Sequence, residues 1–185
     1  MSSKTWDIKS DITQGDWSLF LDRDGVINRR IVDDYVKRWE DFEFLPGVLD
    51  SFPVFAKNFK HIFIVTNQQG VGKGLMTVED VEAVHQKMKV AIENTACKID
   101  GIYFCPSLAA EQNPCRKPNI GMAHQAQADF PDVDFSKSIM VGDSPSDMEF
   151  GINAGMKTVF IGNRTLKFPT DVRFNKLVDF AQSLK

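Results

Sequence analysis

Short apolar runs that stop abruptly at polar residues recur along this chain, and they constrain its fold more than any other feature. The first run, Trp17–Leu21, ends at Asp22 and Asp24, and Gly25 follows directly. Other runs of strand length cover residues 61–66, 102–105, 138–142 and 158–161. Continuous apolar runs are typical of parallel strands whose two faces are both covered by helices. The chain is therefore expected to build a buried parallel sheet.

Helix signals alternate with these runs. The predicted helices extend from Pro46–Gly47 to about Asn58, from Thr77 with Asp80 through Ile92, from about Ile120 to Asp129, from Pro145 to Ala154–Gly155, and over a last segment marked by Phe174, Leu177, Val178 and Leu184. Pro53 is expected to interrupt or kink the first of them. This alternation predicts an α/β fold of the Rossmannoid kind, a three-layer sandwich with a parallel sheet of about five strands.

Length and composition predict one domain over residues 1–185, with residues 1–15 as a loose N-terminal arm and no large cap domain. Hydrophobic residues make up 43% of the chain and charged residues 25%, which argues against general disorder. The formal net charge of −3 does not favour nucleic acid as a partner, and no apolar run is long enough to span a membrane. We expect a cytoplasmic monomer.

The polar residues that follow four of the runs should meet at one edge of the sheet, where ligands bind in open α/β folds. They are Asp22 and Asp24, Thr66 and Asn67, Arg116 and Lys117, and Asp143 and Asp147. Carboxylate oxygens suit Mg²⁺, and hydroxyl and ammonium donors suit a phosphoryl group. A carboxylate can also attack phosphorus and form an aspartyl phosphate. The combination indicates phosphoryl chemistry.

Four short motifs carry a resemblance to a known family. Residues 22–26 read Asp-Arg-Asp-Gly-Val, 65–67 Val-Thr-Asn, 116–118 Arg-Lys-Pro, and 142–147 begin with Gly-Asp and end with Asp. Together they resemble the motifs of haloacid dehalogenase (HAD) superfamily phosphatases. The segments 35–36, 40–48, 66–68 and 115–118 are similar, more narrowly, to the branch of histidinol-phosphatases and D-glycero-D-manno-heptose 1,7-bisphosphate phosphatases.

The resemblance implies a role for each motif. Asp22 would be the nucleophile, and Asp24 would protonate the leaving oxygen and then accept a proton from water. Asp22, Asp143 and the main-chain carbonyl of Asp24 would bind Mg²⁺. Thr66 and Lys117 would stabilise the transferring oxygens. The candidates for substrate contacts are Asn67, Gln68, Gln69 and Arg116. Asp147 would either position the metal-bound water or the loop, or lie on a solvated helix surface.

The substrate implied is a small phosphorylated metabolite, and the first choice is D-glycero-D-manno-heptose 1,7-bisphosphate. Histidinol phosphate is the nearest alternative, and a polynucleotide 3′-phosphate is more distant. A catalytically idle scaffold is a rival of another class, but buried paired carboxylates would destabilise a scaffold without purpose. Arg29 and Arg30 are either anchors for a second anionic group or solvated surface residues.

Two features depart from the branch that the chain resembles. Related heptose phosphatases often bind zinc through four residues, and the matching positions here are Cys105, Ser107, Asn113 and Cys115. Structural zinc normally needs four protein ligands, so no structural zinc is expected, and the cysteines are expected to be free thiols. Ser144 stands where relatives often carry a basic residue. The role of Lys73, in a glycine-rich loop that lacks the complete nucleotide-binding pattern, stays open.

Overall fold

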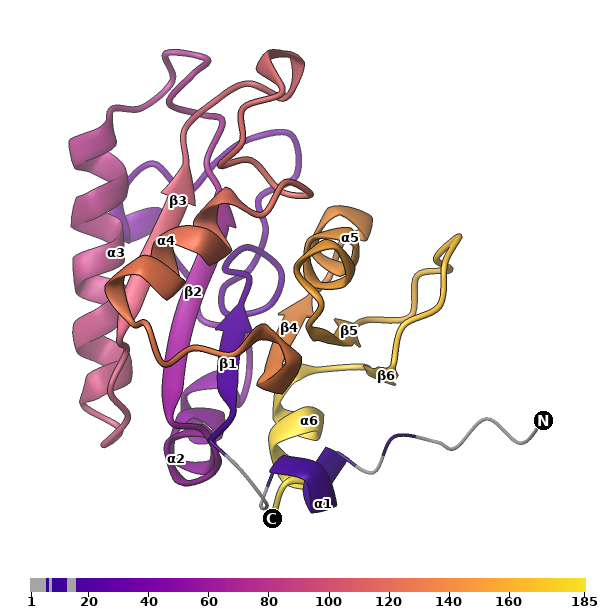
Figure 1. Cartoon of the computed structure of the whole chain (residues 1–185). Coiled ribbons are helices and arrows are strands. Elements are labelled where there is room, and N and C mark those ends of the chain that lie inside the picture. The colour runs from indigo at the N-terminus through magenta and orange to yellow at the C-terminus, as the bar shows by residue number, and fades with distance from the viewer. Residues whose placement is uncertain (1–5, 7, 13–15) are drawn as a thin grey trace.

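The computed structural model describes residues 6, 8–12 and 16–185, and the sheet is its central layer (Figure 1). Among the described residues, six strands lie in the order β3-β2-β1-β4-β5-β6, and every neighbouring pair is parallel. Their bounds are β1 Ser18–Leu21, β2 His61–Asn67, β3 Gly101–Cys105, β4 Ser138–Gly142, β5 Lys157–Ile161 and β6 Val172–Phe174. The predicted α/β class with a parallel sheet is confirmed.

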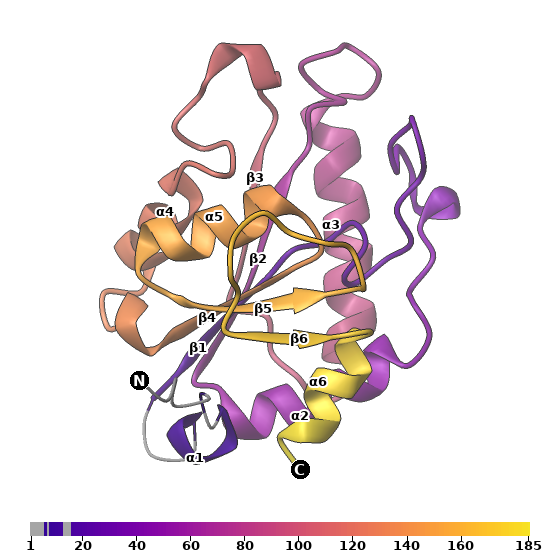
Figure 2. The same ribbon diagram turned by 90° about the vertical axis from the view of Figure 1, so that its right-hand side faces the viewer.

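Helices cover both faces of this sheet (Figure 2). Their bounds are α1 Ile8–Ile12, α2 Val48–Asn58, α3 Val78–Glu93, α4 Gly121–Asp129, α5 Pro145–Ala154 and α6 Leu177–Ser183. Apolar residues of α1, α2, α3 and α6 share one buried cluster, and those of α4 and α5 share another. The three-layer arrangement follows because the sheet presents apolar side chains to both sides.

The central strand β1 shows why its sequence is apolar throughout. Leu19 and Leu21 belong to the first cluster, and Phe20 belongs to the second, where its ring lies 4.9 Å from that of Phe63. Successive side chains of a strand point to opposite faces, so a strand with two covered faces has no polar position. All three side chains are fully buried. Because β1 lies between β2 and β4, Asp22, which directly follows β1, lies at the middle of the sheet's carboxyl edge.

Helix ends follow the local signals, with one exception. Thr77 and Asp80 form a reciprocal capping box at the start of α3, and Gly155 ends α5 in the left-handed conformation at φ +78°. Of the two predicted effects of Pro53, an interruption or a kink, the interruption is wrong, because α2 continues through Pro53 to Asn58. Packing explains this outcome: Phe55 contacts Phe180 of α6 at 5.5 Å between ring centroids and holds the C-terminal half of α2 in place.

Two further expectations are corrected at the ends of the chain. The predicted loose arm includes the short helix α1, whose Ile8 and Ile12 are buried in the first cluster, while residues 1–5, 7 and 13–15 of that arm lie outside the described residues. Phe174 lies in β6, a short edge strand that the sequence pattern did not reveal, and α6 begins only at Leu177. Among the described residues, no helix is both long enough and apolar enough to cross a bilayer.

Candidate active site

A cavity of about 290 Å³ opens at the carboxyl ends of the central strands. The chain runs from β1 outward to β2 and β3, and it later returns to the other side of β1 as β4. Strand order reverses at this point, and such a switch leaves a crevice in which open α/β sheets bind ligands. Lining residues include Asp22, Asp24, Thr66, Lys117 and Asp147. The structure thus brings residues from all four predicted strand ends to one cavity or its edge.

Three carboxylates form what we call the acidic cluster: Asp22, Asp143 and Asp147. Each offers an oxygen, and these oxygens lie within 4.8 Å of one another. Two glycines make this convergence feasible. A Cβ at Gly25, which has φ +97°, would collide with the Asp143 carboxylate, and a Cβ at Gly142 would collide with Asp147. Side chains at these two positions would therefore push the carboxylates apart.

Lys117 is the cation buried within this cluster. Its Nζ donates to Asp22 Oδ1 at 2.7 Å and to the main-chain oxygen of Val65 at 2.8 Å, and it lies 2.6 Å from Asp147 Oδ1. The three ammonium protons are thus all directed to acceptors. The main chain of Lys117 is held in turn by Asn67, whose side chain donates to Lys117 O at 3.1 Å and accepts from Lys117 N at 3.0 Å.

The acidic cluster carries more negative charge than Lys117 neutralises. Burial and the charge of Asp147 raise the pKa of Asp22 to about 7, although Lys117 opposes the shift. Burial, together with the charge of Asp147, also raises the pKa of Asp143 to about 6, against the effect of Arg30. A group of oxygen ligands with unbalanced negative charge suits a hard divalent cation. The residues present therefore fit a metal site.

Asp147 lies in this buried setting and not on a solvated helix surface. It is 1% exposed, and its Oδ2 accepts from Ser144 N at 3.0 Å and from Ser144 Oγ at 2.6 Å. The same carboxylate therefore fixes the first turn of α5 and contacts Lys117 through its other oxygen. Of the two alternatives left by the sequence, the structure favours a positioning role.

Asp24 lies at the same strand end but faces a set of donors, which we call the Asp24 network: Arg23, Asn28 and Gln68. Arg23 Nη2 is 2.9 Å from Asp24 Oδ2, Asn28 Nδ2 is 2.9 Å from Oδ1, and Gln68 Nε2 is 2.8 Å from Oδ2. Burial opposes ionisation of Asp24, but the Arg23 charge and these hydrogen bonds outweigh it and lower the pKa.

Behind this network lies His85, a residue that sequence reasoning assigned only a structural or surface place. The Arg23 side chain is completely buried, and its Nη1 lies 3.0 Å from His85 Nε2. Because a guanidinium can only donate, Nε2 must accept and therefore carries no proton. Burial and the Arg23 charge lower the pKa of His85 to about 3. The sequence contains no spacing signal that pairs these two residues.

The predicted substrate contacts divide into two groups. Gln69 and Arg116 line the cavity, and Gln69 Nε2 donates to the Tyr35 hydroxyl at 2.9 Å. Gln68 differs from the expectation, because its side chain is fully buried and donates to Thr66 Oγ1 at 2.9 Å as well as to Asp24. It contacts Thr66 and Asp24 and is not among the residues that line the cavity.

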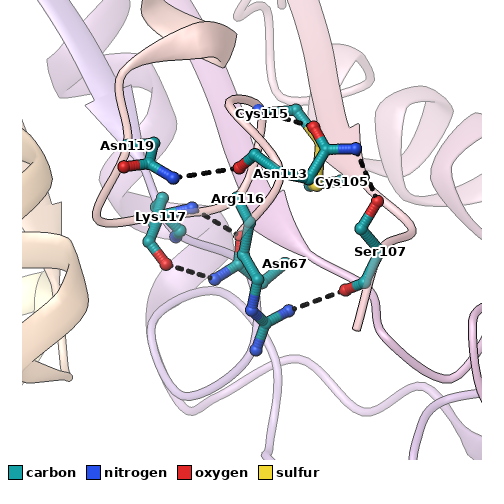
Figure 3. The surroundings of a disulfide bond; sticks show 8 residues. All are labelled: Asn67, Cys105, Ser107, Asn113, Cys115, Arg116, Lys117 and Asn119. Atoms are coloured by element: carbon teal, nitrogen blue, oxygen red, sulfur yellow. Dashed lines mark hydrogen bonds between the residues drawn. A yellow bond between two sulfur atoms is a disulfide. The ribbon is translucent and has the colours of Figure 1, made fainter. Parts of the chain in front are cut away.

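A disulfide joins Cys105, at the end of β3, to Cys115, next to Arg116 (Figure 3). The prediction of free thiols at these positions is wrong. It was based on the expected compartment, whereas the fold sets the two Cα atoms 5.4 Å apart, within the range that a disulfide spans. Cys97, expected to be a buried helix residue, is free and buried but lies after the end of α3, outside any helix.

The disulfide closes a loop that hydrogen bonds also stabilise (Figure 3). Asn113 Nδ2 donates to Ser107 Oγ at 2.8 Å, and Arg116 Nη1 donates to Ser107 O at 3.1 Å. The four positions considered for zinc thus form a covalent and hydrogen-bonded clamp. The clamp holds the segment that delivers Arg116 and Lys117 to the cavity.

Comparison with known proteins places this geometry in a family. The family profile described as "Polynucleotide kinase 3 phosphatase" matches residues 19–174. A D-glycero-alpha-D-manno-heptose-1,7-bisphosphate 7-phosphatase from Mycobacterium tuberculosis is 39% identical over 170 residues, which cover 89% of this chain and 90% of the relative. The chain belongs to the HAD superfamily, in its heptose bisphosphate phosphatase branch.

Other members of the branch agree. An enzyme from Campylobacter jejuni with the same name is 41% identical over 150 residues, covering 81% of this chain and 84% of the relative. The crystal structure of the D,D-heptose 1,7-bisphosphate phosphatase from B. bronchiseptica, complexed with magnesium and phosphate, superposes with a TM-score of 0.81 at 28% identity. That superposition covers 91% of this chain and 97% of the other. The predicted superfamily, fold class and phosphatase class are confirmed.

Residues 28–44, a mostly irregular segment that we call the flap, carry two neighbouring arginines with different surroundings. Arg29 is exposed and pairs with Glu43 at 2.7 Å. Arg30 Nη2 donates to the Asp24 main-chain oxygen at 2.9 Å and to Asp143 Oδ1 at 2.8 Å. The flap also carries Tyr35, whose ring lies 5.4 Å from Lys73 Nζ. Sequence reasoning named Arg30 but could not place it, because its partner Asp143 is 113 residues away.

Proposed function

We propose that this chain is a Mg²⁺-dependent phosphatase that hydrolyses one phosphate ester of a small phosphorylated sugar, with D-glycero-D-manno-heptose 1,7-bisphosphate as the first choice. One observation carries the proposal: Asp22 lies in a cavity with one oxygen held by Lys117 and two further carboxylates at its side. The names of relatives that are 37–41% identical to this chain support the choice of substrate. The solved relative with magnesium and phosphate supports the choice of cation.

In this proposal Mg²⁺ is held by Asp22, Asp143 and the main-chain oxygen of Asp24. When bound, it neutralises the carboxylates so that a phosphate dianion can approach them. Lys117 keeps one oxygen of Asp22 fixed at 2.7 Å, which leaves the other oxygen for attack on phosphorus. Thr66, at the end of β2, and Lys117 donate to the transferring phosphoryl oxygens.

Two displacements at phosphorus complete the reaction. An oxygen of Asp22 forms a bond to phosphorus while the ester oxygen leaves, and Asp24 donates a proton to that oxygen. Asp24 then accepts a proton from water, whose oxygen attacks phosphorus and releases phosphate and Asp22. The Asp24 network holds this carboxylate as the anion before substrate binds. The approaching phosphate dianion disfavours that negative charge, so Asp24 takes up a proton from solvent, which it can then donate to the ester oxygen.

Specificity would come from the flap and from the loop that the disulfide clamps. Gln69, Tyr35 and Arg116 line the cavity away from the acidic cluster, and they provide hydrogen-bond donors for sugar hydroxyls and for a second anionic group. We also propose a monomeric working unit. A polynucleotide 3′-phosphate fits less well, because the formal net charge of −3 gives no general attraction for nucleic acid.

Phosphate release in the presence of Mg²⁺ tests this function. The substrates would be both anomers of the heptose bisphosphate, histidinol phosphate and a 3′-phosphorylated oligonucleotide. We expect the highest kcat/KM with one heptose bisphosphate anomer and loss of release in Asp22→Asn. Equal rates for wild type and Asp22→Asn would remove Asp22 from its role and revive the scaffold alternative. Faster turnover of histidinol phosphate would keep the mechanism and change the substrate.

A further inference from the structure

Arg30 contacts two atoms that the proposed function assigns to the metal. Its Nη2 donates to the main-chain oxygen of Asp24 at 2.9 Å and to Oδ1 of Asp143 at 2.8 Å. These are two of the three proposed ligands of Mg²⁺, and the third is the nucleophile Asp22. The guanidinium thus adds a second positive charge at the acidic cluster, beside Lys117.

The guanidinium and the cation cannot use these oxygens together in the same geometry. Mg²⁺ binds oxygen at about 2.0–2.1 Å and requires a nearly octahedral arrangement. A nitrogen within hydrogen-bond distance of both oxygens overlaps the volume that the ion and its remaining ligands need. The guanidinium and the cation are like charges that use the same two oxygens, so binding of the cation favours displacement of Nη2 from them.

The flap limits where the displaced side chain can go. Asn28, two residues before Arg30, is fully buried, donates to Asp24, and forms bridges with Asp24 and Phe44. The main chain is thus anchored close to Arg30, and the movement is left to the side chain, which is 43% exposed. Arg30 itself lines the cavity, as does Arg116 from the opposite loop. A displaced guanidinium remains beside the cavity.

We propose that Arg30 is an internal competitor of the divalent cation and that, once displaced, it binds the second anionic group of the substrate. The inference rests on the proposed function. Arg30 balances part of the negative charge of the acidic cluster in the metal-free protein and exchanges that contact for a substrate contact when the cation binds. Cation binding thereby prepares the cavity for a bisphosphate in preference to a monophosphate.

Calorimetric titration of the metal-free protein with Mg²⁺ tests the competition without substrate or turnover. Arg30→Gln should bind Mg²⁺ about 3- to 10-fold more tightly, as expected for loss of one partly exposed ion pair. Arg29→Gln is the matched control, because Arg29 is the neighbouring flap arginine and pairs with Glu43 instead; its affinity should equal that of wild type. An unchanged affinity in Arg30→Gln would overturn the proposal.

A second measurement separates direct competition from long-range repulsion. The ¹⁵N guanidinium signals of Arg30 should shift and broaden as Mg²⁺ is added to wild type, while those of Arg29 stay in place. Signals of Arg30 that do not respond would show that it acts only through its charge, which contradicts the exchange. If neither wild type nor Arg30→Gln binds Mg²⁺, the metal site of the proposed function fails as well.

Steady-state kinetics tests the second half of the exchange. With saturating Mg²⁺, Arg30→Gln should raise KM for the bisphosphate about 5-fold or more and leave KM for a sugar monophosphate nearly unchanged, since only the former has a second anionic group to lose. Arg29→Gln should alter neither constant. Equal increases in KM for both substrates, or none, would overturn the assignment of Arg30 to the second anion.

Discussion

Asp22 and Asp24 leave the same strand end two residues apart, yet their carboxylates have opposite electrostatic surroundings. Asp22 lies against two further carboxylates and one lysine, and burial raises its pKa to about 7. Asp24 accepts from Arg23, Asn28 and Gln68, and its pKa is lowered. Pairs of acidic groups whose pKa values are driven apart divide the chemical roles between them. In the metal-free protein these directions run opposite to the proposed roles, because a nucleophile acts as the anion and a proton donor as the acid. A bound divalent cation would favour the ionised form of Asp22, and an approaching phosphate dianion would favour the protonated form of Asp24.

The two regions are also assembled differently. The acidic cluster joins β1, β4 and α5 with Lys117 from a distant loop, so it depends on the register of the whole sheet. The Asp24 network joins residues 23–28 to the end of β2, and α3 adds His85 behind it. The first region carries excess negative charge that a cation can balance. The second is already balanced inside the protein.

The largest expected effect separates the two carboxylates by activity. Asp22→Asn should lower kcat by about 10⁴-fold or more, because the nucleophile is lost, and Asp24→Asn by about 10²- to 10⁴-fold, because proton transfer is lost. Phosphate release under saturating Mg²⁺ measures both. A greater loss in Asp24→Asn than in Asp22→Asn would reverse the division of roles.

Removing the buried cation should break the acidic cluster. Lys117→Met leaves Asp22 and Asp147 without their shared partner, and a broken buried ion pair typically lowers the free energy of unfolding by about 3–5 kcal/mol. Urea denaturation in EDTA at neutral pH measures the change. Lys37→Met is the control, because Lys37 pairs with Asp34 at the surface and should alter the free energy by less than about 1 kcal/mol. Similar changes in the free energy of unfolding for the two substitutions would show that Lys117 does not stabilise the acidic cluster.

The raised pKa of Asp22 also affects the stability of the fold, independently of catalysis. A carboxyl with a pKa of about 7 in the folded protein and 3.8 in the unfolded chain destabilises the fold as pH rises through that window. In EDTA, Asp22→Asn should therefore increase the free energy of unfolding at pH 8, on the order of 1 kcal/mol, while abolishing activity. At pH 4 the difference should disappear. A variant less stable than wild type at pH 8 would refute this.

The smallest expected effect concerns His85, behind the Asp24 network. Its contribution to stability grows as pH rises, which is opposite to the contribution of Asp22. His85 has a pKa of about 3 when folded and 6.5 when unfolded, so the stability it supports is complete above pH 6.5 and is lost as pH falls toward 3. The difference in free energy between wild type and His85→Gln should change across this window, on the order of 1 kcal/mol. A difference that stays constant between pH 6.5 and pH 3 would refute this assignment.

Most of the fold follows from local patterns. The apolar runs predict β1 to β5 because burial on both faces removes polar residues from a strand, and Pro145, Gly155 and the Thr77–Asp80 pair predict helix ends through local hydrogen bonds. The edge strand β6 was missed because it has only three residues and none of them is fully buried. Local signals are weakest at the edge of a sheet, where neighbouring segments supply little burial.

Most residues of the candidate site could also be predicted from the strand ends, since the carboxyl ends of parallel strands lie at one edge of the sheet. Only the tertiary structure decided how these residues are paired. Gln68 turns to Asp24, Arg30 reaches Asp143, and the fold brings Cys105 to Cys115. The physical reason is that sequence determines which residues an element carries to the edge, whereas side-chain direction and loop packing determine which of them touch.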